Sequence, residues 1–152
     1  MRITLAAIGK AKPGAARDLY DHYAGRLRSH LTLKEVEERR ALKAQALKEQ
    51  EGKLLLAAVP RGARIIALDE GGKDLSSRDF AALLGRWRDE GIQETAFLIG
   101  GAEGLSQAAR QAADVTLCLG RLTWPHMLVR GLLAEQLFRA ESILAGHPYH
   151  RG

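Results

Sequence analysis

The sequence predicts one α/β domain. Short apolar runs of strand length recur at residues 3–8, 64–68, 95–99 and 115–119, and stretches with helical periodicity lie between or after them. Such alternation is typical of a sheet flanked by helices. A chain of 152 residues can form one hydrophobic core, and no internal repeat, linker or low-complexity tract divides it. We therefore expect a single domain over residues 1–152.

The first half of the chain supplies further predicted elements between the apolar runs. Residues 14–29 have an amphipathic pattern and follow the helix-breaking stretch 12–14, which predicts a helix. Residues 31–38 alternate as a half-exposed strand does. The Lys- and Glu-rich stretch 39–59 carries leucines at helical spacing, and we expect its helix to end at Pro60–Gly62.

Two helices are predicted in the second half. Ser76 or Ser77 can cap a helix that runs through Trp87 and ends at Gly91. The last helix opens after Pro125, continues to about residue 145 and carries a leucine-rich stripe. Gly131 lies inside it, where glycine costs about 1 kcal/mol relative to alanine. This glycine is expected to let another helix come close.

Composition limits the classes of protein that the chain can represent. The net charge of +5 is a moderate basic bias, compatible with nucleic-acid binding without establishing it. The single cysteine, Cys118, lies in an apolar run and is predicted to be a core residue in a reducing compartment. The N-terminus has no signal-peptide pattern, and no apolar stretch approaches the roughly 18 residues that a membrane span needs. We expect a cytoplasmic protein that does not enter a membrane.

Glycines recur just after three of the predicted strands, in the stretches 68–73, 99–104 and 119–120. Ligands of open α/β sheets bind at the carboxyl ends of strands, where glycine lets the backbone approach a ligand closely. The three loops together therefore predict one pocket. The alternative is that each glycine only serves a turn.

Familiar nucleotide and metal motifs are absent. A dinucleotide-binding fingerprint would need glycine where Ile99 stands, and it would follow the first strand. A phosphate-binding P-loop ending at Lys73 would need glycine in place of Ala67 and a hydroxyl residue in place of Asp74. No metal-ligand spacing of cysteine or histidine occurs, so we expect no bound metal.

Three motifs together carry a resemblance to one known family. They are Ile99-Gly-Gly-Ala-Glu-Gly-Leu-Ser106, Leu119-Gly-Arg-Leu-Thr-Trp-Pro-His126 and His147-Pro-Tyr-His-Arg151. In this order, along the whole chain, they resemble the ribosomal RNA large-subunit methyltransferase H group of the SPOUT class, which methylates N3 of a pseudouridine. The combination is far more specific than any one motif.

The resemblance implies a trefoil-knotted α/β methyltransferase with a mainly parallel sheet flanked by helices, a topology that periodicity would never suggest because knots are so rare. It implies S-adenosylmethionine as the cofactor. It also implies a cofactor pocket lined by Leu68, Gly100, Leu119, Gly120, Arg121, Leu122, Thr123 and Trp124. The family often carries serine at position 120 and tryptophan at position 141, so Gly120 and Glu141 depart from its pattern.

Candidate catalytic and substrate residues lie on the last helix and in the C-terminal tail. His150 can accept the pseudouridine N3 proton, because its ordinary pKa is about 6.5. Tyr149 can stack on the base, while Arg139 and Arg151 can hold phosphates or negative charge. Glu135 and His147 complete the expected set. For Glu135 and Arg139, four residues apart on a helix, an ordinary ion pair is the explanation that spacing alone favours.

His126, a lone histidine at the start of the last helix, is expected to be structural. For the tail, the alternative to a role in substrate binding is a frayed chain end.

The resemblance further implies a substrate and partners. We expect a homodimer that joins one protomer's cofactor pocket to the other's tail, and a substrate in the helix 69 region of 23S rRNA within the assembled 70S ribosome. Two other classes stay open: an α/β enzyme that binds a different adenosine-containing molecule, and a noncatalytic RNA-binding module supported only by the basic charge. Calorimetry with adenosylmethionine, S-adenosylhomocysteine and ATP separates these two classes from the methyltransferase.

Overall fold

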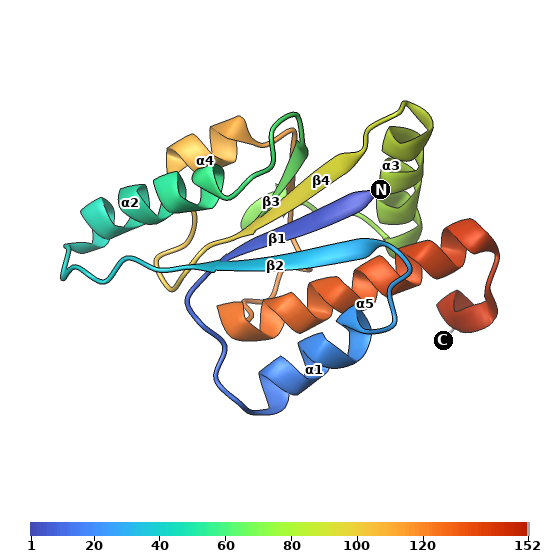
Figure 1. Cartoon of the computed structure of the whole chain (residues 1–152), viewed down its shortest axis with the longest axis horizontal. Coiled ribbons are helices and arrows are strands. Elements are labelled where there is room, and N and C mark those ends of the chain that lie inside the picture. The colour runs from blue at the N-terminus through green and yellow to red at the C-terminus, as the bar shows by residue number, and fades with distance from the viewer. Residues whose placement is uncertain (152) are drawn as a thin grey trace.

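The fold is a five-stranded parallel sheet with helices on both faces (Figure 1). The computed structural model describes the backbone of residues 1–151 and the side chains of residues 1–149. The strands are β1 (Arg2–Ile8), β2 (His30–Val36), β3 (Arg64–Lys73), β4 (Glu94–Ile99) and β5 (Val115–Leu117), in the spatial order β2-β1-β4-β3-β5. Every pairing between neighbouring strands is parallel.

The helices are α1 (Ala15–Ala24), α2 (Ala44–Ala57), α3 (Ser77–Asp89), α4 (Gln107–Ala112) and α5 (His126–Ala145), followed by a short 3-10 turn, η1 (Pro148–Arg151). Helices α2 and α4 cover one face of the sheet, while α1, α3 and α5 lie on the other (Figure 1).

Alternation along the strands divides the core between these two layers. On β1, Leu5 and Ala7 point toward α1, α3 and α5, whereas Ala6 and Ile8 point toward α2 and α4. Side chains alternate in the same way on β3 and β4. Because both faces are covered, the central strands are apolar at nearly every position, which is why the sequence showed them as continuous apolar runs.

Several element bounds differ from the sequence prediction. The first helix ends at Ala24 rather than near residue 29, and Gly25 follows it. The stretch 69–73, expected as a loop, continues β3 with irregular pairing, in which Leu117 faces both Leu68 and Lys73. At Gly72 an added Cβ would lie 2.6 Å from the carbonyl carbon of Leu117, so only glycine lets β3 approach β5 here.

Helix α4 was not predicted. It has only six residues, too few for periodicity to reveal, although Ser106 caps it by accepting a hydrogen bond from the Ala109 N–H at 3.1 Å. The other capping prediction is resolved in favour of Ser76, whose hydroxyl accepts from the Asp79 N–H at 3.0 Å.

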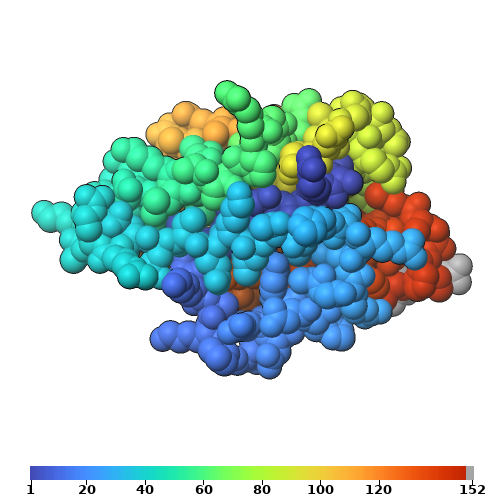
Figure 2. Space-filling model, in the orientation of Figure 1, coloured from blue at the N-terminus to red at the C-terminus, as the bar shows by residue number. Residues whose placement is uncertain are grey.

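Helix α5 organises the face that carries α1 and α3. The close approach predicted at Gly131 is confirmed, because an added Cβ there would lie 2.7 Å from the Leu19 side chain of α1. Glu141, near the other end of α5, accepts hydrogen bonds from the backbone N–H groups of Arg28 and Ser29 at 2.9 and 2.8 Å. In the space-filling view the C-terminal part of α5 accordingly lies against the segment that joins α1 to β2 (Figure 2).

Candidate functional site

A cavity of about 340 Å³ lies at the carboxyl ends of β3, β4 and β5. The three glycine-containing segments predicted to meet there all contribute to its wall. Much of the wall is apolar or backbone, with Leu68, Leu105 and Val129 among its side chains. The volume and position are those expected for a small-molecule site in an open α/β sheet.

Six of the eight residues predicted to hold the cofactor line this cavity: Leu68, Gly100, Leu119, Gly120, Leu122 and Trp124. Arg121 and Thr123 belong to the same segment but do not line it. The Trp124 indole Nε1 donates to the Leu119 carbonyl oxygen at 3.0 Å and so ties together the two ends of the segment. The Leu122 side chain nevertheless remains 72% exposed.

Two glycines in the wall are required for different reasons. An added Cβ at Gly100 would lie 2.8 Å from the carbonyl carbon and oxygen of Gly104, so Gly100 lets its own loop fold tightly. Gly120 has a φ of +91°, a left-handed conformation that strains other residues. The departure from serine at position 120 is therefore compatible with the local backbone.

Sequence reasoning missed the charged groups around the cavity. These are Lys48, Asp69, Glu70, Glu103 and Arg110. The Arg110 guanidinium donates to the Leu105 carbonyl at 2.7 Å and lies 4.0 Å from the Asp69 carboxylate. Lys48 comes from α2, far from the glycine motifs, and no local sequence signal could have placed it here.

His126 also lines the cavity, although the sequence suggested a structural role for it. Burial, and secondarily the charge of Arg130, lowers the pKa of the His126 imidazole below its usual value. This shift favours the neutral imidazole. His126 ends the Leu119–His126 motif, and its position beside the cavity makes it a candidate contact.

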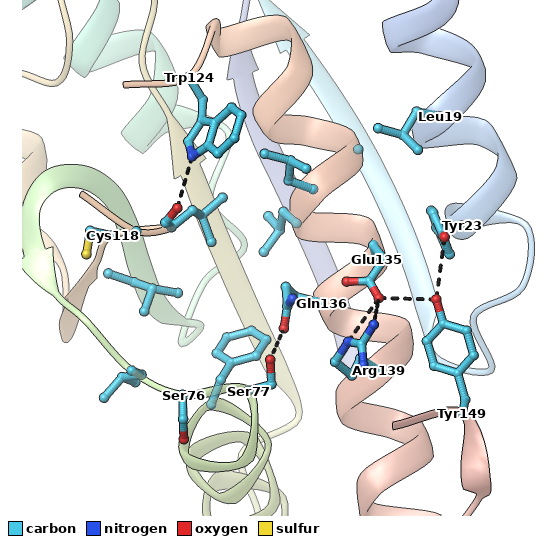
Figure 3. A pocket seen from close by; sticks show the side chains of 18 residues that line it. Leu19, Tyr23, Ser76, Ser77, Cys118, Trp124, Glu135, Gln136, Arg139 and Tyr149 are labelled. Carbon is cyan, nitrogen blue, oxygen red and sulfur yellow. Dashed lines mark hydrogen bonds and ion pairs between the residues drawn. The ribbon is translucent and has the colours of Figure 1, made fainter. Parts of the chain in front are cut away.

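A second, larger cavity of about 520 Å³ shares a wall with the first. Both are lined by Leu117, Leu119, Gly120 and Trp124. The larger one is a groove between α5, α1 and the start of α3 (Figure 3). Its lining is mainly apolar, and Glu135, Arg139 and Tyr149 contribute polar groups to it. The segment 117–124 thus separates a predicted cofactor pocket from a groove that contains predicted catalytic residues.

Glu135, Arg139 and Tyr149 form one hydrogen-bonded cluster (Figure 3). The Arg139 Nη2 and Nε atoms donate to Glu135 Oε1 at 2.6 and 3.0 Å, so the expected ion pair is present. The Tyr149 hydroxyl donates to the same oxygen at 3.1 Å. The hydrogen bond to Glu135 raises the already high pKa of the Arg139 guanidinium. Arg139 therefore keeps its positive charge in the groove.

The Tyr149 hydroxyl is held in its neutral form. Burial raises its pKa, and the hydrogen bond with Tyr23 and the negative charge of Glu135 raise it further. The ring packs edge to face against Phe138, with centroids 4.6 Å apart, and the Arg139 guanidinium lies 5.1 Å from its centre. Tyr149 therefore already packs within its own chain instead of projecting freely from the tail.

A second polar pair faces the groove: the Ser77 hydroxyl donates to Gln136 Oε1 at 2.7 Å (Figure 3). A basic group that sequence reasoning missed lies on the outer side of this region. The Arg26 guanidinium is 4.3 Å from the Phe138 ring centre and 5.7 Å from that of Tyr149. Its position after α1 gives no sequence signal for such stacking.

The tail forms the short turn η1 rather than an unstructured end. His147 directly precedes it: its backbone N–H donates to the Ser142 carbonyl at 2.8 Å, and its Nδ1 accepts from the Tyr149 N–H at 3.3 Å. The side chains of His150 and Arg151, predicted to act on the substrate, lie outside the described residues. Their roles remain predictions.

Metal and membrane features were sought over the same part of the chain. Among residues with described side chains, no group of three His, Cys, Asp or Glu side chains is placed to hold a metal ion. None of the described helices combines the length and apolarity needed to cross a bilayer.

Solved structures with the same fold include a probable methylase family protein from Haemophilus influenzae, with a TM-score of 0.62 and 12% identity over 97% of this chain and 69% of that chain. Another is a probable methyltransferase from Bordetella pertussis, with a TM-score of 0.60 and 17% identity over 91% and 95% of the two chains. At these identities the likeness concerns the fold alone.

Sequence comparison is more specific. Residues 1–150 match the family described as "Predicted SPOUT methyltransferase". The chain is 58% identical to "Ribosomal RNA large subunit methyltransferase H" of Rhodospirillum centenum over 99% of each chain. It is 51% identical to the protein of the same name from Hyphomonas neptunium, again over 99% of each. The chain therefore belongs to the SPOUT methyltransferase family and, within it, to the ribosomal RNA large subunit methyltransferase H group.

Proposed function

We propose that this protein transfers a methyl group from S-adenosylmethionine to N3 of a pseudouridine in 23S ribosomal RNA. At the coarser level, family membership makes it a methyltransferase of large-subunit ribosomal RNA. The observation that supports the finer proposal is the shared wall at Leu117, Leu119, Gly120 and Trp124. It puts a pocket of cofactor size next to a groove that holds the Glu135, Arg139 and Tyr149 cluster.

The cavity at the strand ends fits adenosylmethionine. Its apolar side chains suit the adenine ring, and the backbone of the stretch 100–104 supplies donors and acceptors that can read ring edges and ribose. Lys48 and Arg110 can face the carboxylate of the cofactor, while Asp69, Glu70 or Glu103 can face its ammonium group. When bound, the cofactor supplies a sulfonium methyl group that is already electrophilic.

The protein's task is then to position the base and stabilise its anionic form. Pseudouridine N3 must lose its proton as it attacks the methyl group in line. Arg139 can stabilise the resulting negative charge, and Glu135 fixes the orientation of that guanidinium through two hydrogen bonds. His150 is the proposed proton acceptor, while Tyr149, His147 and Arg151 are the proposed substrate contacts.

We further propose that the active form is a homodimer and that the assembled 70S ribosome, in the helix 69 region, is the substrate. The mainly apolar groove of about 520 Å³ along α5 supports the homodimer, because an apolar surface of that kind in a small domain marks an interaction site. A dimer would bring one protomer's tail toward its partner's cofactor pocket. We also propose that the chain forms the trefoil knot that the family resemblance implies.

Methyl transfer to defined substrates tests the function. Purified protein and tritiated adenosylmethionine are incubated with 70S ribosomes, isolated large subunits or naked 23S rRNA from cells that lack the enzyme. The expected result is one methyl group per ribosome on N3 of a pseudouridine, located by mass spectrometry, with little transfer to naked RNA. Ribosomes in which that pseudouridine is replaced by uridine are the matched control. Absence of any pseudouridine methylation overturns the proposal.

A further inference from the structure

Glu51 of α2 is a buried carboxyl group that the proposed mechanism does not use. Its side chain is only 7% exposed, and Oε1 has no hydrogen-bond partner. No ion pair involves Glu51 within the part of the chain whose side chains are described. A charged carboxylate without a partner is costly to bury, and its retention calls for an explanation.

The position of the Glu51 carboxyl group supplies an explanation for its burial. An added Cβ at Gly101 would lie 3.2 Å from Glu51 Oε2 and 3.3 Å from Oε1, with Ile8 Cγ2 at 3.1 Å. Both carboxyl oxygens thus lie directly against Gly101, a residue that lines the cofactor cavity. Lys48, one turn earlier on α2, lines the same cavity.

The next residue of α2 contacts the other end of the same loop. An added Cβ at Gly52 would collide with Ser106 Oγ, the group that caps α4. Glu51 therefore meets the 100–104 loop at Gly101, and Gly52 meets Ser106, just beyond the other end of the loop. Between them the loop is closed on itself by the hydrogen bond from the Gly104 N–H to the Gly101 carbonyl, at 3.0 Å.

We propose that Glu51 is a positioning residue whose carboxyl group holds the 100–104 loop in the shape that binds the cofactor. This inference rests on the proposed function, because the loop is taken to be part of an adenosylmethionine pocket. A neutral carboxyl has both a donor and an acceptor, and can hydrogen-bond to a loop carbonyl and a loop N–H. An ionised carboxylate can only accept, and it repels the nearby Glu103.

The electrostatic surroundings favour the neutral acid. Burial raises the pKa of the Glu51 carboxyl, and the negative charge of Glu103 in the loop raises it further. The cationic side chains on the surrounding elements form no ion pair with Glu51 among the described residues. Arg110 of α4 and Lys34 of β2 donate to backbone carbonyls, and Lys48 is one turn away on α2. Raising the pH through this elevated pKa therefore ionises Glu51 and weakens its hold on the loop.

A set of variants separates this role from simple packing. Glu51→Gln keeps the size and both hydrogen-bonding functions without a titrating proton, while Glu51→Leu keeps the volume and loses the polar group. Glu49→Gln is the matched control, because Glu49 is exposed on the same helix. Binding of S-adenosylhomocysteine to the full-length protein is measured by calorimetry from about pH 5 to pH 9.

For the wild type and the control, affinity should fall with rising pH, by at most about tenfold per pH unit for one linked proton. Glu51→Gln should keep the affinity that the wild type shows at low pH and lose most of this slope. Glu51→Leu should stay folded, with a thermal midpoint no lower than that of the wild type, but bind about tenfold more weakly at every pH. Full affinity in Glu51→Leu, or equal slopes in the wild type and Glu51→Gln, overturns the proposal.

A second measurement does not depend on the cofactor. In the unliganded protein, amide hydrogen exchange at Gly101–Gly104 should be faster in Glu51→Leu than in the wild type or in Glu49→Gln. Unchanged exchange contradicts the positioning role even if no variant binds S-adenosylhomocysteine. Failure of the wild type itself to bind this probe counts instead against the proposed function, so the two failures are distinguishable.

Discussion

Arg130 and Glu35 form an ion pair with 2.5 Å between Nη1 and Oε2, although 95 residues separate them in the sequence. Arg130 is almost completely buried, and its Nη2 atom also donates to the carbonyl oxygens of Ile8 and Gly9 at 3.1 and 2.7 Å. One side chain of α5 thus fastens the ends of β1 and β2. Arg130 lies near the start of α5, which follows the 119–124 segment of the candidate site. The position of that segment depends on where α5 begins.

Glu35→Gln should destabilise the protein by about 2 kcal/mol at neutral pH, because a buried guanidinium loses its charged partner. Burial raises the pKa of Glu35, but the Ala11 N–H and the Arg130 guanidinium outweigh that effect and hold the pKa below its ordinary value. A lowered carboxyl pKa gives stability that is present above the unfolded value of about 4.3 and is lost as the pH falls through the folded value. Urea unfolding should therefore show that the difference in stability between the wild type and Glu35→Gln becomes smaller in acid. A difference that stays constant with pH contradicts this explanation.

Gly100→Val should leave a folded protein that binds S-adenosylhomocysteine at least about a hundredfold more weakly, a loss of ~2.7 kcal/mol. The added side chain would collide with the backbone of Gly104 and Leu105, so the loop must open. The physical cause is thus distortion of the loop, rather than filling of the space for the ligand. Calorimetry measures the affinity and circular dichroism the fold; unchanged affinity would mean that the loop does not contact the cofactor.

Tyr149→Phe removes the hydrogen bonds of the hydroxyl with Glu135 and Tyr23 while keeping the ring that packs on Phe138. We expect a stability loss of about 1.5 kcal/mol, because one of the lost hydrogen bonds is to a charged carboxylate. Methyl transfer to ribosomes should fall through kcat, since Glu135 and Arg139 lose part of their orientation. Steady-state kinetics with ribosomes tests this. A variant altered only in KM would assign the hydroxyl to substrate binding.

Leu132→Asp should convert the proposed homodimer into a monomer, because Leu132 lines the apolar groove and a carboxylate there would be buried on association. Leu144→Asp is the matched control on the same helix, at an exposed leucine that does not line this groove. Light scattering at micromolar concentration reports the mass. A monomeric wild type, or a dimeric Leu132→Asp protein, contradicts the proposed interface.

Deletion of residues 147–152 should abolish methyl transfer to ribosomes and leave cofactor binding nearly intact. No described tail residue lines the cavity of about 340 Å³, whereas Tyr149 lines the groove. Within the tail, His150→Ala should lower the rate at saturating substrate, and Arg151→Ala should weaken ribosome binding and its salt dependence. Tritiated-methyl transfer and calorimetry measure the two functions in parallel. Full activity of the truncated protein would show that the tail makes no substrate contact.

The sequence alone determined the elements whose signals are local. Buried central strands show as apolar runs because both faces of the sheet are covered, and α5 shows as a long leucine-rich helix after Pro125. The three glycine segments, one at the end of β3 and the others after β4 and β5, predicted one pocket, because parallel strands end at one edge of the sheet. Residues that lie in sequence motifs were accordingly found together.

Only the tertiary structure decided which distant groups meet. Lys48 reaches the candidate cofactor cavity, Arg26 stacks on Phe138, and Glu51 lies against Gly101. None of these contacts has a local signal, because each depends on how a helix from elsewhere in the chain packs on the sheet. The same reason explains why helix α4 was not predicted. Its six residues are too few for a periodic pattern, and the helix forms mainly because Ser106 caps it and Ala109 is buried. The burial of Ala109 depends on tertiary packing.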